Sequence, residues 1–256
     1  MGGEILFKGK NLIPLNEEEM RKIRWKHISI VFQGAMNALN PVFRVGDQIV
    51  EAIRTHEPHI SKEEAMERAK ELLELVGLKA SRAYDYPHEF SGGMRQRALI
   101  AMALSCNPDL LIADEPGTAL DVIVQAQILK LLKELRDRLN LSMILITHDL
   151  SIIAETCDTV AIMYAGKIVE AGKVIDIFKD PLHPYTKGLI GAFPSLKGER
   201  RRMASIPGSP PDLLYPPEGC RFHPRCSYAM EICKKAEPPL VKIGNRYVAC
   251  HLVQRA

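Results

Sequence analysis

The stretch Leu110-Leu111-Ile112-Ala113-Asp114-Glu115-Pro116 decides the fold class of this chain. A short, uninterrupted run of apolar residues such as Leu110 to Ala113 is typical of a strand buried on both faces of a parallel sheet. Two carboxylates follow the run directly, so we expect them at the carboxyl end of the strand, where α/β sheets bind their ligands. An adjacent acidic pair is equally compatible with a solvated turn, and the neighbouring motifs must decide between the two.

Strands and helices alternate around this stretch, and this order predicts an α/β domain with a largely parallel sheet. The clearest helix is 61–76, because Ser61 and Glu64 form a capping box and Gly77 supplies the stop. Further helices are expected over 94–104 and 122–139. Strands are expected over 4–11, 28–32, 110–113, 142–147, 159–164 and 167–170, the last two joined by a turn at Ala165-Gly166.

Composition indicates an ordinary soluble protein of 256 residues, long enough for one core and a small appendage. A net charge of +3 is too small to argue for a nucleic-acid partner. No apolar run reaches the length of a membrane span. The start, Met1-Gly2-Gly3-Glu4, lacks the pattern of a signal peptide, so we expect a cytosolic protein with reduced thiols.

A change of composition near Phe193 predicts a domain boundary. Beyond it lie the charge run Lys197 to Arg202 and the proline-rich linker Pro207-Gly208-Ser209-Pro210-Pro211. We therefore expect a core domain over 1–190 and an extension over 191–256.

Ser91-Gly92-Gly93 precedes an apolar helix, and such a segment can bind phosphate. Two glycines let backbone N–H groups approach an anion, and the helix N-terminus adds positive potential. A lone Ser-Gly-Gly is more often a helix-start loop without a ligand. Asp121, which precedes the helix over 122–139, is a good helix N-cap in its own right.

Four motifs in this order resemble the nucleotide-binding subunit of an ABC transporter, and the resemblance covers nearly the whole chain. They are Phe90-Ser91-Gly92-Gly93-Met94-Arg95-Gln96, Leu110 to Pro116, Thr118-Ala119-Leu120-Asp121 and Ile146-Thr147-His148-Asp149. The resemblance implies the fold of an ABC ATPase, with ATP and Mg²⁺ as its ligands. Met94 departs from the usual glutamine of the signature, a change that peptide-importing members tolerate.

The resemblance also implies roles for single residues. Asp114 would hold Mg²⁺ through water, and Glu115 would polarise the attacking water. His148 would contact the γ-phosphate as the switch histidine, although a histidine after a strand is more often a capping residue. Gln33 would sense Mg²⁺ and the membrane subunits, and this role depends wholly on the resemblance.

Two further segments would act at subunit interfaces. Ser91-Gly92-Gly93 would bind the γ-phosphate held by the opposite subunit of a head-to-tail dimer. Asp121 would lie at the same interface, whether or not it also caps its helix. The segment from Gly34 to Arg44 would receive a coupling helix of the membrane subunit.

His183-Pro184-Tyr185-Thr186, followed by a proline-rich tail with cysteines, narrows the resemblance to the ATPases of oligopeptide and dipeptide importers. The plainer interpretation is a turn before a helix. The implied partners are a second ABC ATPase subunit (in a homo- or heterodimer), transmembrane permease subunits and, indirectly, a solute-binding protein. The implied location is the cytoplasmic face of the membrane. An ABC ATPase that handles nucleic acid is disfavoured by this tail.

The tail cysteines Cys220, Cys226, Cys233 and Cys250 are separated by five, six and sixteen residues. Reduced thiols in a segment with little core of its own favour a metal. The resemblance implies a [4Fe–4S] cluster; Zn²⁺, with His223 or His251 as added ligands, and four unliganded thiols remain as alternatives. Cys106 and Cys157 are expected in the core.

The sequence contains no Gly-x-x-x-x-Gly-Lys-Ser/Thr, the loop that holds ATP phosphates in this family. This absence predicts a member that is truncated at its N-terminus and lacks the strand and helix around that loop. We expect an energy-coupling subunit of a peptide importer that is inactive alone. The alternative is a non-catalytic subunit that lends its signature segment to a partner's ATP site.

Overall fold

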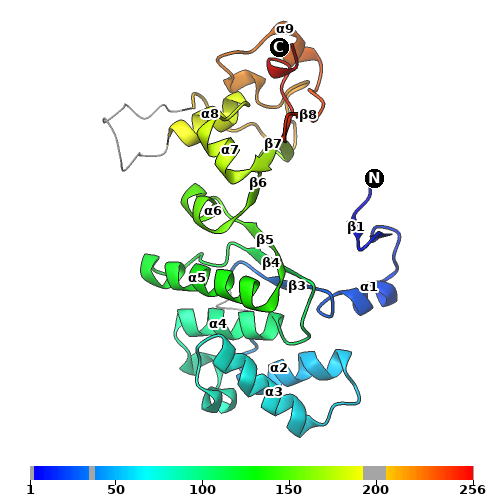
Figure 1. Ribbon diagram of the computed structural model, residues 1–256, viewed down its shortest axis with the longest axis vertical. Coiled ribbons are helices and arrows are strands. Elements are labelled where there is room, and N and C mark those ends of the chain that lie inside the picture. Colours follow the sequence, from blue (N-terminus) through cyan, green and yellow to red (C-terminus); the bar gives the residue numbers. More distant parts are fainter. Residues whose placement is uncertain (1–2, 35–37, 193–205, 256) are drawn as a thin grey trace. The chain divides into compact units, whose positions relative to one another are not determined.

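The computed structural model describes residues 3–34, 38–192 and 206–255 (Figure 1). The chain separates into two compact units, Met1–His148 and Asp149–Ala256. The charge run Lys197 to Arg202, and residues 35–37 of the segment expected to receive a coupling helix, lie outside the described residues. The predicted domain boundary near residue 190 stays a prediction.

A three-stranded parallel sheet forms the centre of the first unit. Its strands are β3 (Ile28–Val31), β4 (Leu110–Asp114) and β5 (Ser142–Ile146), in the order β3-β4-β5. The parallel arrangement predicted from the sequence is therefore confirmed here. Strand β5 is the last strand of this sheet, and its residues Ile144 and Ile146 are 48% and 47% exposed, so it is not buried on both faces.

Helices of the first unit carry most of its apolar core. They are α1 (Glu17–Ile23), α2 (Val45–His56), α3 (Lys62–Leu75), α4 (Gly92–Ala103) and α5 (Val122–Leu139), with short 3₁₀ turns η2 (Ala80–Tyr84) and η3 (Pro87–Glu89). The Ser61–Glu64 capping box at the start of α3 is confirmed, and α5 has the predicted bounds. Helix α4 starts two residues earlier than predicted, at Gly92.

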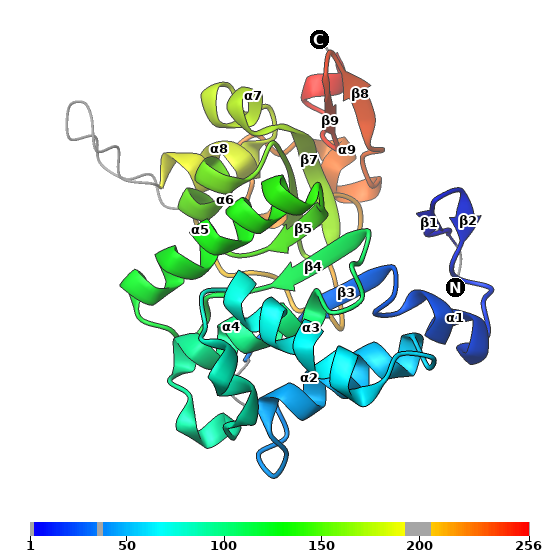
Figure 2. The same cartoon turned by 60° about the horizontal axis from the view of Figure 1, so that its bottom comes forward.

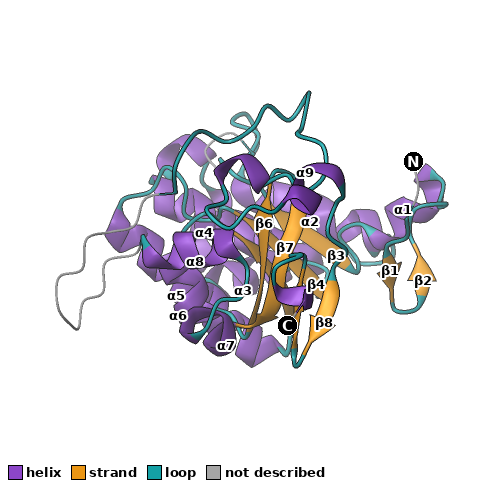
Figure 3. Cartoon of the chain, turned by 90° about the horizontal axis from the view of Figure 1, so that it is seen from above, coloured by secondary structure: helices purple, strands orange, loops and turns teal. Residues whose placement is uncertain are grey.

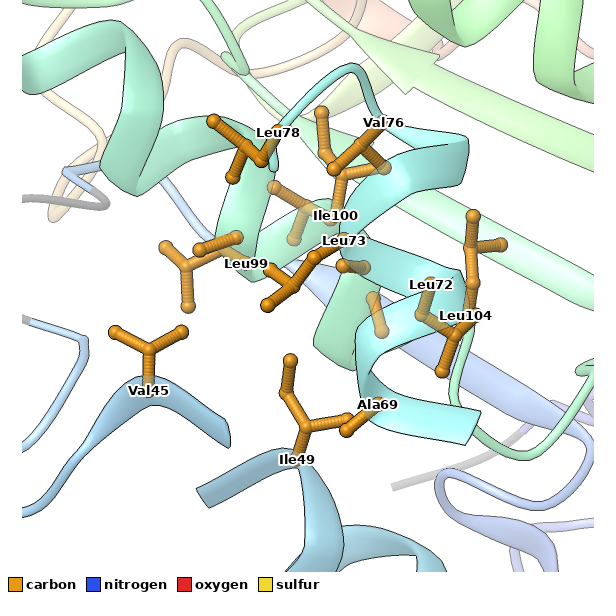
Figure 4. Packing of buried hydrophobic residues seen from close by; sticks show 14 of the residues in the cluster. Val45, Ile49, Ala69, Leu72, Leu73, Val76, Leu78, Leu99, Ile100 and Leu104 are labelled. Carbon is orange, nitrogen blue, oxygen red and sulfur yellow. The ribbon is translucent and has the colours of Figure 1, made fainter. Parts of the chain in front are cut away.

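The core of this unit forms where α2, α3 and α4 pack together, and α4 also contacts β3 and α5. Ile49 of α2, Leu73 of α3 and Ile100 of α4 are fully buried and point toward one another (Figure 4). Figure 1 shows α4 between the sheet and the α2–α3 pair, and Figure 2 shows the same unit with this pair turned toward the viewer. Burying one such side chain stabilises the folded state by about 1.5–3 kcal/mol, so the packing of these helices supports the sheet.

The predicted strand over 4–11 was wrong. The segment is a hairpin of two short antiparallel strands, β1 (Leu6–Phe7) and β2 (Lys10–Asn11). Lys8 and Gly9 have φ values of 48° and 79°, the left-handed pair that a tight two-residue hairpin turn requires.

The second unit contains an antiparallel sheet, so the expected largely parallel arrangement does not extend to it. Figure 3 shows its strands in orange. They are β6 (Thr159–Tyr164), β7 (Lys167–Lys173), β8 (Val241–Ile243) and β9 (Arg246–Val248), in the order β6-β7-β9-β8. The predicted turn at Ala165-Gly166 is confirmed, with φ values of 47° and 78°.

The second unit also contains short helices, of which α7 and α8 contact the sheet. They are α6 (Leu150–Thr156), α7 (Val174–Lys179), α8 (Pro184–Gly191), η4 (His223–Arg225), α9 (Glu231–Lys235) and η5 (Val253–Arg255). Across the described residues, no helix combines the length and apolar character that a membrane span needs.

The His183-Pro184-Tyr185 motif anchors the start of α8. His183 Nδ1 accepts a hydrogen bond from the Tyr185 N–H at 3.0 Å, which caps the helix. The buried carboxylate of Glu170 accepts from the N–H groups of Leu182 and His183, both at 2.9 Å. Burial lowers the pKa of His183 to about 4, so its ring is neutral at neutral pH.

Candidate functional site

The carboxylate of Glu115 is the meeting point of the predicted catalytic residues. Gln33 Nε2 donates to its Oε2 at 2.9 Å, and His148 Nδ1 lies 2.9 Å from its Oε1. Gln33, Glu115 and His148 follow β3, β4 and β5, and the carboxyl ends of parallel strands meet at one edge of a sheet. Side chains far apart in sequence therefore converge because the sheet is parallel.

The backbone at Glu115 has an uncommon conformation. Its φ of 43° lies in the left-handed region, which residues with a Cβ seldom adopt. Its N–H donates to the Ile146 carbonyl at 2.9 Å, and its own carbonyl accepts from the Thr118 N–H at 3.0 Å. Strained residues of this kind concentrate at active sites, where the surrounding structure fixes them. Asp114, the last residue of β4, is half-buried immediately before this turn.

Thr118 is a member of this site that the sequence did not reveal. Its hydroxyl donates to Glu115 Oε2 at 2.7 Å, so Oε2 accepts from both Gln33 and Thr118. The sequence signal that could have indicated Thr118 is its hydroxyl group three positions after Glu115, a spacing at which a turn can bring the two side chains together. The turn that brings the two side chains together includes the left-handed φ of Glu115.

These contacts keep Glu115 ionised. The hydrogen bonds from Thr118 and then His148 lower the pKa of Glu115, against a smaller opposing effect of burial. The His148 side chain is 81% exposed and open to a ligand. An ionised carboxylate beside a donor amide and an imidazole can orient a water molecule and accept a proton from it. A second carboxylate at the strand end suits a hydrated divalent cation.

Ser91, Gly92 and Gly93 form the start of α4. Ser91 Oγ caps the helix by accepting from the Met94 N–H at 3.3 Å, and the two glycines are the first helical residues. A Cβ on Gly93 would lie only 2.6 Å from Val124 Cγ1 of α5. Packing against α5 therefore requires glycine at this position, whatever ligand the segment binds.

Asp121 caps α5, because its Oδ1 accepts from the Val124 N–H at 2.9 Å. The capping interpretation is confirmed, and the role at a subunit interface stays a prediction. Val122 and Ile123, which follow it, are strongly exposed.

Burial is the main cause that raises the pKa of the Cys220 thiol to about 11, and the neighbouring cysteines contribute in the same direction. Among the described residues, however, no group of three or more His, Cys, Asp or Glu side chains is placed to hold a metal ion. The structure therefore does not support the predicted iron–sulfur or zinc site.

One ring nitrogen of each histidine proposed as an added zinc ligand contacts a backbone carbonyl. His223 Nδ1 lies 3.0 Å from the Cys220 carbonyl, and His251 Nε2 lies 3.0 Å from the Ala236 carbonyl. Cys106 is a buried core residue as predicted, and Cys157 is half-buried against the core of the second unit.

Two family models match the sequence. Residues 1–118 match the ABC transporter model, and residues 169–233 match the model described as "Oligopeptide/dipeptide transporter, C-terminal region". The second match includes the His183-Pro184-Tyr185 anchor.

Curated relatives match nearly the whole chain. The oligopeptide transport ATP-binding protein OppD of Bacillus subtilis is 54% identical over 248 residues, which are 96% of this chain and 69% of the relative. The dipeptide transport ATP-binding protein DppD of Caldanaerobacter subterraneus is 47% identical over 256 residues, 99% of this chain and 78% of the relative. OppD of Escherichia coli is 51% identical over 252 residues, which are 98% of this chain and 74% of the relative.

Solved structures agree with this assignment. The dimeric bacterial ABC transporter cassette MJ0796 aligns with a TM-score of 0.60 at 29% identity, over 68% of this chain and 74% of that one. CbiO1 of Clostridium perfringens aligns with a TM-score of 0.61 at 30% identity, over 70% of this chain and 69% of that one. With this fold, the Glu115 site and relatives of this similarity, the chain belongs to the family of ATP-binding proteins of oligopeptide and dipeptide ABC transporters.

Proposed function

We propose that this chain is the energy-coupling, ATP-binding subunit of an ABC importer for peptides or similar solutes. One observation carries the proposal: Gln33, Thr118 and His148 converge on the carboxylate of Glu115 at the edge of a parallel sheet. The relatives named for oligopeptide and dipeptide transport supply the solute class.

In this proposal Glu115 orients and polarises the water that attacks the γ-phosphate. Gln33 and Thr118 fix one carboxylate oxygen, and His148 fixes the other until the γ-phosphate engages the imidazole. Asp114, with Gln33, would hold a hydrated Mg²⁺, which supplies charge neutralisation for the phosphates. Each assignment is supported by the position of the side chain at the strand ends.

Partners follow from the family. A second ABC ATPase subunit would contribute its own Ser-Gly-Gly segment to the Glu115 site, and Ser91-Gly92-Gly93 would serve that subunit in return. Transmembrane permease subunits would hold the pair at the inner face of the membrane, with a solute-binding protein delivering the peptide. Residues 1–190 would carry the nucleotide chemistry, and 191–256 would form the extension specific to these transporters.

The 256-residue sequence lacks a Gly-x-x-x-x-Gly-Lys-Ser/Thr loop, so we propose that by itself it binds Mg·ATP weakly. Backbone N–H groups and the lysine of that loop make most contacts to the phosphates. A dissociation constant no tighter than about 1 mM is expected by calorimetry, equivalent to about −4 kcal/mol. Micromolar binding would refute the proposal of weak Mg·ATP binding. It would not affect the role proposed for Glu115, which is tested separately.

The role of Glu115 is tested in a chimera that adds a Gly-x-x-x-x-Gly-Lys-Ser/Thr segment ahead of this sequence. Glu115→Gln should preserve Mg·ATP binding and reduce turnover at least about 100-fold, since it removes only the base. Glu134→Gln, an exposed glutamate on α5, is the matched control and should hydrolyse ATP normally. Normal hydrolysis by Glu115→Gln would refute the assignment.

A metal in the tail is a separate proposal, and no step of the proposed function depends on it. Its support is the chemistry of the cysteines. Four cysteines lie within residues 220–250, close to the proline-rich segment 207–211, and a bound metal would stabilise a segment with little core of its own. The described positions of the side chains do not yet form a ligand set.

A further inference from the structure

The second unit contains a cavity of about 580 Å³ that the proposed ATP chemistry does not use. The β6–β7 hairpin, the segment 220–222 and the segment 237–240 form its walls. Its lining is mostly apolar, with Met163, Ile168 and Leu240 partly open to solvent. This volume lies within the range of small-molecule sites, which are about 300–1,000 Å³.

Hydrogen bonds between the walls fix the shape of the cavity. Arg221 donates to the Ala165 carbonyl at 2.5 Å, which ties the segment 220–222 to the hairpin turn. The Ala249 N–H donates to the Val169 carbonyl at 2.9 Å, and Gln254 Nε2 donates to the Pro239 carbonyl at 2.8 Å. A ligand would therefore enter a preformed space, which reduces the entropy lost on binding.

The charged groups of the cavity are one anion and two cations. Lys167 Nζ lies 2.8 Å from Glu237 Oε1, and both side chains are about half exposed, at 44% and 54%. Arg221 adds a guanidinium beside Gly166 at the hairpin turn. A purely anionic ligand would leave Glu237 opposed to it, and an uncharged one would gain nothing from the pair. A ligand with both a carboxylate and an ammonium group can satisfy all three.

We propose that this cavity binds short peptides with free termini and apolar side chains. The peptide carboxylate would pair with Lys167 and Arg221, its ammonium with Glu237, and its side chains would cover the apolar walls. The inference builds on the proposed function, because a peptide importer delivers such zwitterions to the compartment where its ATP-binding subunit works. The cavity is then a site for the product of transport.

The test uses the dipeptide Leu-Leu and the intact chain labelled with ¹³C at the methionine methyl groups. Met163 lines the cavity, and its signal is assigned with Met163→Leu. Leu-Leu should shift this signal saturably, with a dissociation constant of about 1 mM or tighter. N-acetyl-Leu-Leu-amide, which has the same side chains without terminal charges, should bind at least about tenfold more weakly, because it loses charge-assisted hydrogen bonds.

Two variants assign the charges. Glu237→Gln and Lys167→Met should each weaken Leu-Leu binding about tenfold, the effect of one lost charge-assisted contact. Glu231→Gln and Lys234→Met alter a similar ion pair of 2.7 Å outside the cavity and should leave binding unchanged. Absence of a saturable shift below about 20 mM, or equal binding of the capped and free peptides, would overturn the proposal. The capped peptide is compared on the unmodified chain, so the test does not depend on any variant folding.

This experiment needs neither nucleotide nor membrane subunits. A negative result would leave the role of Glu115 untouched, and a failure of the ATP hydrolysis test would leave the cavity result standing.

Discussion

Gly93→Ala tests whether packing alone requires glycine in the Ser91-Gly92-Gly93 segment. The added Cβ would lie 2.6 Å from Val124 Cγ1, about 1 Å inside an ordinary carbon–carbon contact. Valine is stiff about χ1, so Cγ1 can yield only by leaving its rotamer or by moving α5 away from α4. Overpacking of this kind costs about 1–3 kcal/mol.

A smaller effect acts in the opposite direction. Alanine favours a helix over glycine by up to about 1 kcal/mol, and only part of this applies in the first turn. The free energy of unfolding should therefore fall by about 1–2 kcal/mol in Gly93→Ala. In the Val124→Ala background the obstructing methyl is gone, so the same change should be neutral or stabilising.

The single tryptophan provides the assay for this double-mutant cycle. Trp25 Nε1 donates to the Met102 carbonyl of α4 at 3.0 Å, so its fluorescence during urea unfolding reports on this helix. The coupling free energy between positions 93 and 124 should be about 1–3 kcal/mol, because the destabilising effect of Gly93→Ala disappears when Val124 is truncated. Equal effects of Gly93→Ala in both backgrounds, within about 0.5 kcal/mol, would refute the packing argument.

Three further predictions concern other elements. The pKa of His183 falls from 6.5 to about 4 on folding, so the unfolded chain binds the extra proton, and stability should decrease from pH 6.5 to pH 4 by roughly 3 kcal/mol. Thermal unfolding against pH should show this loss, and His183→Asn, which can still cap α8, should flatten it; an unchanged pH profile would contradict the assignment. Asp121→Ala should lower the free energy of unfolding by about 1 kcal/mol through loss of the α5 cap, whereas Asp121→Asn should retain it, and equal losses in chemical denaturation would point away from capping. Elemental analysis of anaerobically purified protein tests the metal proposal: about four irons per chain, lost in Cys226→Ser, are expected for a [4Fe–4S] cluster, about one zinc would indicate the rival site, and metal-free protein would end the proposal.

The sequence was most informative where a local signal and the burial pattern agreed. Helix α3 carries a capping box, a periodic apolar face and a terminal glycine, and its bounds were predicted to within one residue. The role expected for Gln33 came from the family resemblance alone, whereas its convergence with Glu115 and His148 follows from the order of the parallel strands.

Other features depend on contacts that no local pattern encodes. The segment 4–11 alternates like a strand, yet the left-handed pair Lys8-Gly9 makes it a hairpin. Strands β8 and β9 have three residues each and exist because β9 pairs with β7, far away in sequence. Thr118 reaches Glu115 through a backbone conformation that residue type alone does not predict.

The position of β5 at the end of its sheet also affects how the protein must be handled. The outer side of a terminal strand presents N–H and C=O groups that can pair with a strand of another molecule, and β-branched apolar residues favour such pairing. Ile144 and Ile146 add exposed apolar surface, and β5 carries neither a proline nor a charged residue to discourage association. Solutions of the isolated protein should therefore aggregate more readily as concentration rises, and a lysine at position 144 is the simplest change to improve solubility.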